Sequence, residues 1–137
     1  MRFWAQHLIP MKDLEPTPFL KSFWQTSLHA LNGIALAFES ERSFRIHILA
    51  MVVVTGLGWY VHLSLTEWAV LFLTYGVMLG FELLNTALES MANFIHPEEH
   101  PAIKRVKDLA AGAVQVAAIF SVAIAIVLFG PKIAALL

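Results

Sequence analysis

Three long runs without a charged residue constrain the fold of this chain more than any other feature. They occupy residues 46–63, 68–81 and 109–131 and contain 18, 14 and 23 residues. A helix needs roughly twenty mostly apolar residues to cross a hydrocarbon core about 30 Å thick, so the first and third runs each suffice. The second run continues into a polar segment and reaches that length together with it. The sequence therefore predicts three membrane-spanning helices.

The composition agrees with a membrane protein of one domain. Hydrophobic residues make up 58% of the 137-residue chain and charged residues only 14%, against roughly 25% charged residues in a typical soluble domain. A net charge of −1 excludes a nucleic-acid binder that relies on bulk positive charge. The absence of cysteine excludes disulfides, thiolate catalysis and cysteine-based zinc sites.

The region before the first span divides into a leader and a helix. We expect residues 1–17 to be a poorly ordered leader, because the prolines at its end disfavour helix. An amphipathic helix should follow over about residues 18–40, with Thr17 as N-cap and Pro18 at its first position. We favour a helix that lies on the membrane surface, and a helix packed in the bundle is the alternative. Its apolar face comprises Leu20, Trp24, Leu28, Leu31, Ile34, Ala35 and Phe38.

The fold class expected is an all-α membrane protein, with residues 18–137 as a single domain and spans over about 44–63, 67–95 and 107–130. Lys and Arg are distributed unevenly around these spans: five precede the first, three lie between the second and third, and none lies between the first and second. By the positive-inside rule, the N-terminus and the 95–107 loop are cytoplasmic, and the 63–67 turn and the C-terminus face outward.

The segments between and within the spans carry further local patterns. Ser64 followed three residues later by Glu67 is typical of a capping box at the start of the second span. Gly56 and Gly58 in the first span indicate close helix packing rather than a phosphate loop. The two prolines around residues 96–101 indicate a solvated loop there, so we interpret His96 and His100 as loop residues rather than as metal ligands.

A polar stripe interrupts the second span. Glu82, Asn85, Glu89 and Asn93 fall within roughly 60° of one another on a helix, so they share one face. An ionisable group near the bilayer centre costs roughly 2.5 kcal/mol or more, and its default interpretation is functional. The structural alternative is that Glu82 only holds helices together and that Glu89 and Asn93 lie in a solvated helix end.

Other polar residues are expected at the depth of this stripe. Glu82 lies about 22 Å along the helix from Glu67, just inside the cytoplasmic side of the hydrocarbon, and Glu89 lies about 10 Å further on, at the interface. The charged residues at the starts of the first and third spans reach the same level. They are Glu41, Arg42, Lys107 and Asp108.

This set of residues is chemically suited to phosphoryl transfer. Carboxylates suit a hard divalent cation, and a lysine suits phosphate. No Walker motif is present, so a nucleotide would have to be held by helices. Burial of Glu82 also suits a general base that accepts a proton from the phosphoryl acceptor.

Two sequence motifs resemble those of the prokaryotic integral-membrane diacylglycerol kinase and undecaprenol kinase family. They are Glu82-x-x-Asn85-Thr86-Ala87-x-Glu89 and Lys107-Asp108-x-Ala110-Ala111-x-Ala113-Val114. The resemblance covers residues 20–130, which include Ala37-x-x-x-Glu41-x-x-Phe44-Arg45. It implies a homotrimer of three-span subunits with an amphipathic surface helix and a site shared between protomers. It also implies an enzyme of the bacterial inner membrane that transfers the γ-phosphate of ATP to a lipid hydroxyl on the cytoplasmic side.

The resemblance implies a role for each polar residue of the site. Glu82 would be the base for the lipid hydroxyl, and Asn85 would orient that hydroxyl. Glu41 and Glu89 would hold Mg²⁺ on the ATP phosphates. Lys107 would neutralise phosphate charge, and Asp108 would support the nucleotide or the site.

One residue departs from the family pattern, which usually has an aspartate where this chain has Asn93. Asparagine keeps an acceptor oxygen but loses the charge, and we expect activity to survive, with Glu39 nearby as a solvated carboxylate. Undecaprenol and diacylglycerol both remain possible substrates, with a preference for undecaprenol from the residues around His47 and Trp68.

Two alternatives to an active lipid kinase remain at this point. One is a small ion or metal transporter, with a pathway formed by Glu82, Glu89, His47 and His62. The other is a kinase-like membrane protein whose activity is impaired by Asn93.

Overall fold

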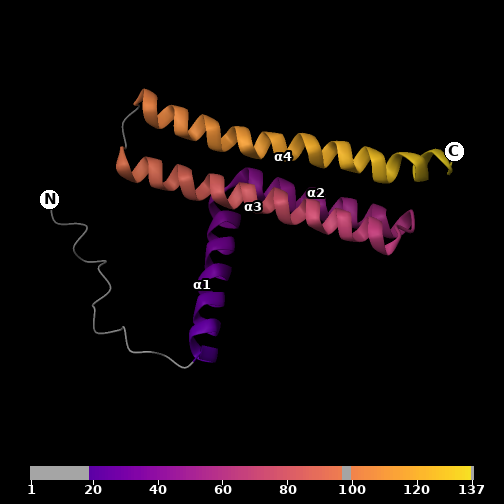
Figure 1. The fold of residues 1–137 in the computed structure, drawn as a ribbon, viewed down its shortest axis with the longest axis horizontal. Coiled ribbons are helices and arrows are strands. Elements are labelled where there is room, and N and C mark those ends of the chain that lie inside the picture. The colour runs from indigo at the N-terminus through magenta and orange to yellow at the C-terminus, as the bar shows by residue number, and fades with distance from the viewer. Residues whose placement is uncertain (1–18, 97–99, 137) are drawn as a thin grey trace. The chain divides into compact units, whose positions relative to one another are not determined.

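The computed structural model describes residues 19–96 and 100–136, which form four helices (Figure 1). The prediction of an all-helical protein is confirmed for these residues, and three of the helices are long and apolar enough to cross a membrane, which makes them candidates for the three predicted spans. The expectations for the leader over 1–17, Thr17 and Pro18 lie outside the described residues. The helices are α1 (Phe19–Ser40), α2 (Arg42–Tyr60), α3 (Leu65–Ile95) and α4 (Pro101–Ala134).

The chain divides into two compact units, one ending at Gly33 and the other covering Ile34–Leu137. Within the first unit, the helical residues from 21 to 33 are almost all exposed, including Phe23 and Trp24. The hydroxyls of Thr26 and Ser27 each donate to the carbonyl four residues earlier, at 2.9 Å. These bonds satisfy the hydroxyls within the helix itself, as suits an apolar environment.

The second unit begins with the last turns of α1, where Arg45 closes the helix end. Its Nη1 donates to the carbonyls of Phe38, at 3.0 Å, and Glu39, at 2.8 Å. The last carbonyls of a helix have no partner within the helix, and a cation there is also favoured by the helix dipole. Arg45 thereby fixes the corner that leads into α2, with Glu41 at its N-cap position.

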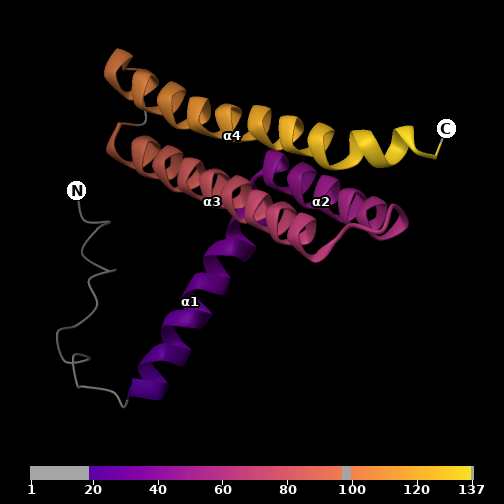
Figure 2. The same ribbon diagram turned by 45° about the vertical axis from the view of Figure 1, so that its right-hand side comes forward.

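The three spans run alongside one another, and α3 packs against both α2 and α4 (Figures 1 and 2). A buried cluster lies near the α2–α3 turn and includes Val61, Leu63, Leu71 and Phe129. The predicted capping box is confirmed: Ser64 Oγ accepts from the Glu67 amide at 3.4 Å, and Glu67 Oε2 accepts from the Ser64 amide at 2.7 Å.

Gly58 confirms the prediction of close packing, and Gly56 does not. A Cβ atom at Gly58 would lie 2.9 Å from both Leu63 Cδ1 and Trp68 Cη2, whereas a Cβ at Gly56 would meet nothing within 4 Å. The short side chain is therefore required only at Gly58, where the α2–α3 turn folds back on the helix.

The helix ends differ from the predicted ones by a few residues. α2 ends at Tyr60 rather than 63, because His62 adopts a positive φ of 54° that no helix continues through. α4 begins at Pro101 rather than about 107, because proline suits the first helical position and His100 Nδ1 accepts from the Ala102 amide at 3.2 Å. The same helix continues past 130, with Pro131 inside its last turns.

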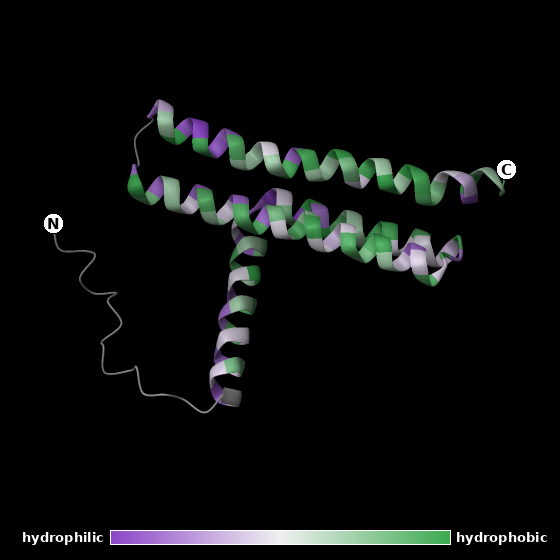
Figure 3. Ribbon diagram, viewed as in Figure 1, coloured by the Kyte–Doolittle hydropathy of each residue, from purple (hydrophilic) through white to green (hydrophobic). Residues whose placement is uncertain are grey.

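The surface of the spans is strongly apolar. Figure 3 shows hydrophobic residues along most of α2, α3 and α4, with hydrophilic residues gathered toward the end of α3 and the start of α4. Many large apolar side chains on these helices are more than half exposed, which is the pattern expected where lipid or other subunits cover them. They include Val52, Val53, Phe72, Phe120, Ile126 and Val127.

Candidate functional site

Glu82 is the buried charged group of the described core, with 2% of its surface exposed. Each of its carboxylate oxygens has a polar contact from α2: His47 Nε2 lies 2.9 Å from Oε1, and Ser43 Oγ donates a hydrogen bond to Oε2 at 3.2 Å. A buried carboxylate is tolerated only when such donors replace its lost hydration. The structure therefore anchors Glu82 to α2.

Ser43 and His47 reach Glu82 together because they are four residues apart at the start of α2, and residues at that spacing share one helix face. Neither residue is predicted from the sequence as a partner of Glu82; His47 enters the sequence-based predictions only in the transport alternative and in the preference for undecaprenol. The available signal was this spacing, directly after the charged corner. It does not reveal which neighbouring helix the pair faces.

Asn85 lies one turn beyond Glu82 on α3. Its Nδ2 donates to Glu89 Oε1 at 3.0 Å, and this bond fixes which way the amide points. The Oδ1 atom on the other side is buried and has no hydrogen-bond partner among the described residues. An unpaired buried acceptor is costly, so a ligand hydroxyl that donated to Oδ1 would be stabilised.

The two predicted site residues of α4 have different neighbours. Lys107 Nζ donates to Asn93 Oδ1 at 2.5 Å and so connects α4 to the end of the polar stripe on α3. Asp108 pairs with Lys104 on its own helix, at 2.7 Å. Because Asn93 is neutral, this contact positions Lys107 without placing a negative charge beside it.

The predicted metal ligands are Glu41 and Glu89. Glu41 accepts from the neighbouring Ser40 hydroxyl at 3.2 Å, and Glu89 accepts from Asn85. Across residues 19–96 and 100–136, no group of three or more His, Asp or Glu side chains could hold a metal. Ligation by Glu41 and Glu89 therefore stays a prediction.

His96 and His100 flank the loop between α3 and α4. Both are exposed, and their ring centroids are 5.3 Å apart. They belong to no metal-binding group within the described chain. Their interpretation as solvated loop residues agrees with this exposure.

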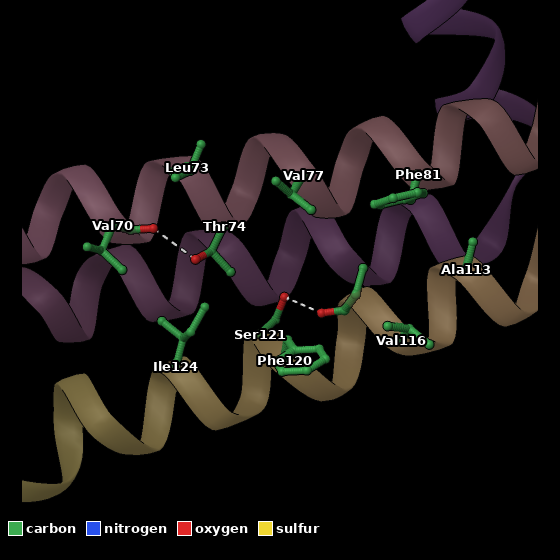
Figure 4. A pocket seen from close by; sticks show the side chains of 11 residues that line it. Val70, Leu73, Thr74, Val77, Phe81, Ala113, Val116, Phe120, Ser121 and Ile124 are labelled. Carbon is green, nitrogen blue, oxygen red and sulfur yellow. Dashed lines mark hydrogen bonds between the residues drawn. The ribbon is translucent and has the colours of Figure 1, made fainter.

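Two cavities of the second unit have mostly apolar walls. A groove of about 510 Å³ lies between α3 and α4, and the only hydroxyls on it, those of Thr74 and Ser121, donate to carbonyls of their own helices (Figure 4). A smaller cavity of about 210 Å³ is lined by all three spans and includes His47. Apolar walls of this kind suit hydrocarbon rather than a nucleotide.

Fold and site together define an all-helical membrane protein. Its three long apolar helices carry a buried carboxylate, an adjacent amide and a lysine toward one end of the bundle. Comparisons with known proteins identify the class further, since the model of the family described as prokaryotic diacylglycerol kinase matches residues 28–129. The chain belongs to this family.

Individual relatives agree with the family match. An undecaprenol kinase of Bacillus subtilis (strain 168) is 41% identical over 114 residues, which cover 83% of this chain and 93% of the relative. A diacylglycerol kinase of Synechocystis sp. is 37% identical, with 88% and 73% covered, and one of Helicobacter pylori (strain 26695) is 32% identical, with 80% and 88% covered. These names support a lipid kinase and do not favour the transporter alternative.

Proposed function

We propose that this lipid kinase transfers the γ-phosphoryl group of ATP to the hydroxyl of a membrane lipid, with Glu82 as the base. The observation that carries the proposal is the buried Glu82 carboxylate, held on both oxygens by α2 at distances of 2.9 and 3.2 Å. A purely structural carboxylate in a membrane is costly. The role of a base for a lipid hydroxyl would account for a carboxylate at this position.

The chemistry requires one proton transfer and one exchange of P–O bonds. The lipid oxygen forms a bond to the γ-phosphorus while the bond from that phosphorus to the bridging oxygen of ADP breaks, and the hydroxyl proton passes to the Glu82 carboxylate. The unpaired Oδ1 of Asn85, one turn away, supports a role in accepting from the same hydroxyl and orienting it. A positioned base contributes typically about 10²- to 10⁴-fold to such a rate.

The charged residues beyond Glu82 fit the triphosphate. Lys107 contacts the neutral Asn93 and would neutralise phosphate charge, while Asp108, which pairs with Lys104, would support the nucleotide from the same helix. Mg²⁺ usually binds proteins through one or two carboxylates together with substrate phosphates and water. We propose that Glu41 and Glu89 are those carboxylates. When bound, Mg²⁺ supplies neutralisation of the charge that develops on the phosphate oxygens.

The lipid is proposed to be undecaprenol, with diacylglycerol as the alternative. The relative with 41% identity is named undecaprenol kinase, and those with 37% and 32% identity are named diacylglycerol kinase. Both lipids offer a hydroxyl at the interface and differ in the apolar chain behind it.

The assembly proposed is a homotrimer in the bacterial inner membrane, with the N-terminus and the site on the cytoplasmic side. Exposed apolar side chains on all three spans leave ample surface for contact between subunits. The exposed aromatic residues Phe23 and Trp24 support a surface position for α1. The distribution of Lys and Arg supports the orientation.

The proposal is tested by phosphate transfer with purified protein in lipid micelles. Radiolabelled ATP, Mg²⁺ and either undecaprenol or diacylglycerol are supplied side by side, and the labelled lipid is extracted. We expect label in undecaprenol phosphate, little label without Mg²⁺, and a large loss in Glu89→Gln. Failure to label either lipid would refute a lipid kinase of this specificity.

A further inference from the structure

We propose that His47 is a positioning residue for Glu82 in the transfer reaction. The inference rests on the proposed function, because it concerns the residue that takes up the lipid proton. His47 Nε2 lies 2.9 Å from Glu82 Oε1, within reach of a hydrogen bond, and belongs to the second turn of a different helix.

The contact restricts how the carboxylate can rotate. A glutamate side chain turns about several bonds, and fixing such a side chain has an entropy cost that the protein must offset. His47 and Ser43 hold the two oxygens from one helix face, at 2.9 and 3.2 Å. The carboxylate plane is thus set before substrate arrives, which is how a supporting residue improves a base.

His47 also differs from the charged residues that surround the stripe. Among the described residues, His47 alone has a basic side chain within ion-pair distance of Glu82. The neighbouring charges are engaged elsewhere: Arg45 on the end of α1, Glu89 with Asn85, and Lys107 with Asn93. Loss of His47 would therefore leave Ser43 as the remaining donor to the carboxylate.

The test separates positioning from packing with two substitutions at one site. His47→Leu keeps bulk and removes the donor, whereas His47→Gln keeps an N–H the same number of bonds from Cβ as the imidazole Nε2. A hydrogen bond to a charged group is worth enough for His47→Leu to lower kcat by about 10- to 100-fold, with the KM for ATP unchanged. His47→Gln should recover most of that loss. His62→Asn, at the α2–α3 turn, is the matched control and should behave as wild type.

A double substitution checks that His47 acts through Glu82. In a Glu82→Gln background, His47→Leu should lower kcat no further, because residues of one unit are not additive. A kcat of His47→Leu within about twofold of wild type would overturn the inference, because the lost hydrogen bond should cost far more. Equal losses in His47→Leu and His47→Gln would also overturn it, since the donor would then not matter.

A spectroscopic measurement keeps the test independent of turnover and of the folding of His47→Leu. In protein with ¹⁵N-labelled histidine, the Nε2 resonance of His47 should shift in Glu82→Gln and stay in place in Glu67→Gln. An unmoved resonance in Glu82→Gln would refute the contact. Absence of lipid phosphorylation by the wild type would instead refute the proposed function and leave this reading of the contact intact.

Discussion

Asn93→Asp tests whether the neutral side chain at residue 93 favours the binding of ATP phosphate by Lys107. The substitution replaces an amide by a carboxylate of nearly the same shape, 2.5 Å from Lys107 Nζ. The neutral contact becomes an ion pair, and the lysine charge offered to the nucleotide is partly compensated. We therefore expect weaker ATP binding while the fold is retained.

The magnitude follows from the exposure of the pair. Asn93 is exposed and Lys107 half-buried, and ion pairs of this kind are worth about 0.2–1 kcal/mol because water and salt screen them. If that energy must be given up when Lys107 turns to phosphate, the KM for ATP rises about 1.4- to 5-fold. The Debye screening length falls from about 10 Å at 0.1 M salt to about 3 Å at 1 M, so the rise in the KM for ATP should be smaller at high salt.

The assay is the KM for ATP in lipid micelles at low and high KCl, with Asn93→Ala as the neutral control. Asn93→Ala removes the contact without adding charge and should leave the low-salt KM below that of Asn93→Asp. A KM for Asn93→Asp equal to or below that of wild type, together with a higher kcat, would refute this reasoning. It would support the alternative of a kinase impaired by its asparagine.

Two further predictions concern stability and are checked by thermal unfolding in detergent. Gly58→Ala should destabilise the fold by about 1–3 kcal/mol, because the added Cβ would overpack against Leu63 and Trp68. Gly56→Ala should leave the stability unchanged or raise it slightly, because alanine has the higher helix propensity. Equal effects at the two glycines would contradict the packing described. Ser64→Ala removes one half of the capping box and should cost about 0.5–2 kcal/mol, so an unchanged Tm would show that the cap contributes nothing.

The helices and the polar stripe follow from the sequence because they depend on neighbours in the chain. The lengths of the runs without charged residues predict the number of long apolar helices, and the Ser64–Glu67 spacing predicts the start of α3. The predicted end of α2 lies three residues beyond the observed one, because the positive φ of His62 depends on how the turn packs. Local patterns thus predict the existence of elements better than their ends.

The contacts of the stripe could not be predicted in the same way. Glu82, Asn85, Glu89 and Asn93 share one side of α3, but the structure directs Glu82 to α2 and Asn93 to α4. Which neighbour a residue meets depends on the rotation and register of packed helices, and spacing within one helix does not fix these. The sequence therefore identified Asn93 as unusual without revealing its contact with Lys107.

The role of Glu82 as the base is tested most simply by the kcat of Glu82→Gln for lipid phosphorylation at saturating ATP. Glutamine keeps the shape of the side chain but cannot take up the lipid proton. We expect a loss of about 10²- to 10⁴-fold in kcat, with the KM for ATP and the helical circular dichroism unchanged. A Glu82→Gln enzyme that turns over at a rate near wild type would show that the buried carboxylate only holds α2 and α3 together.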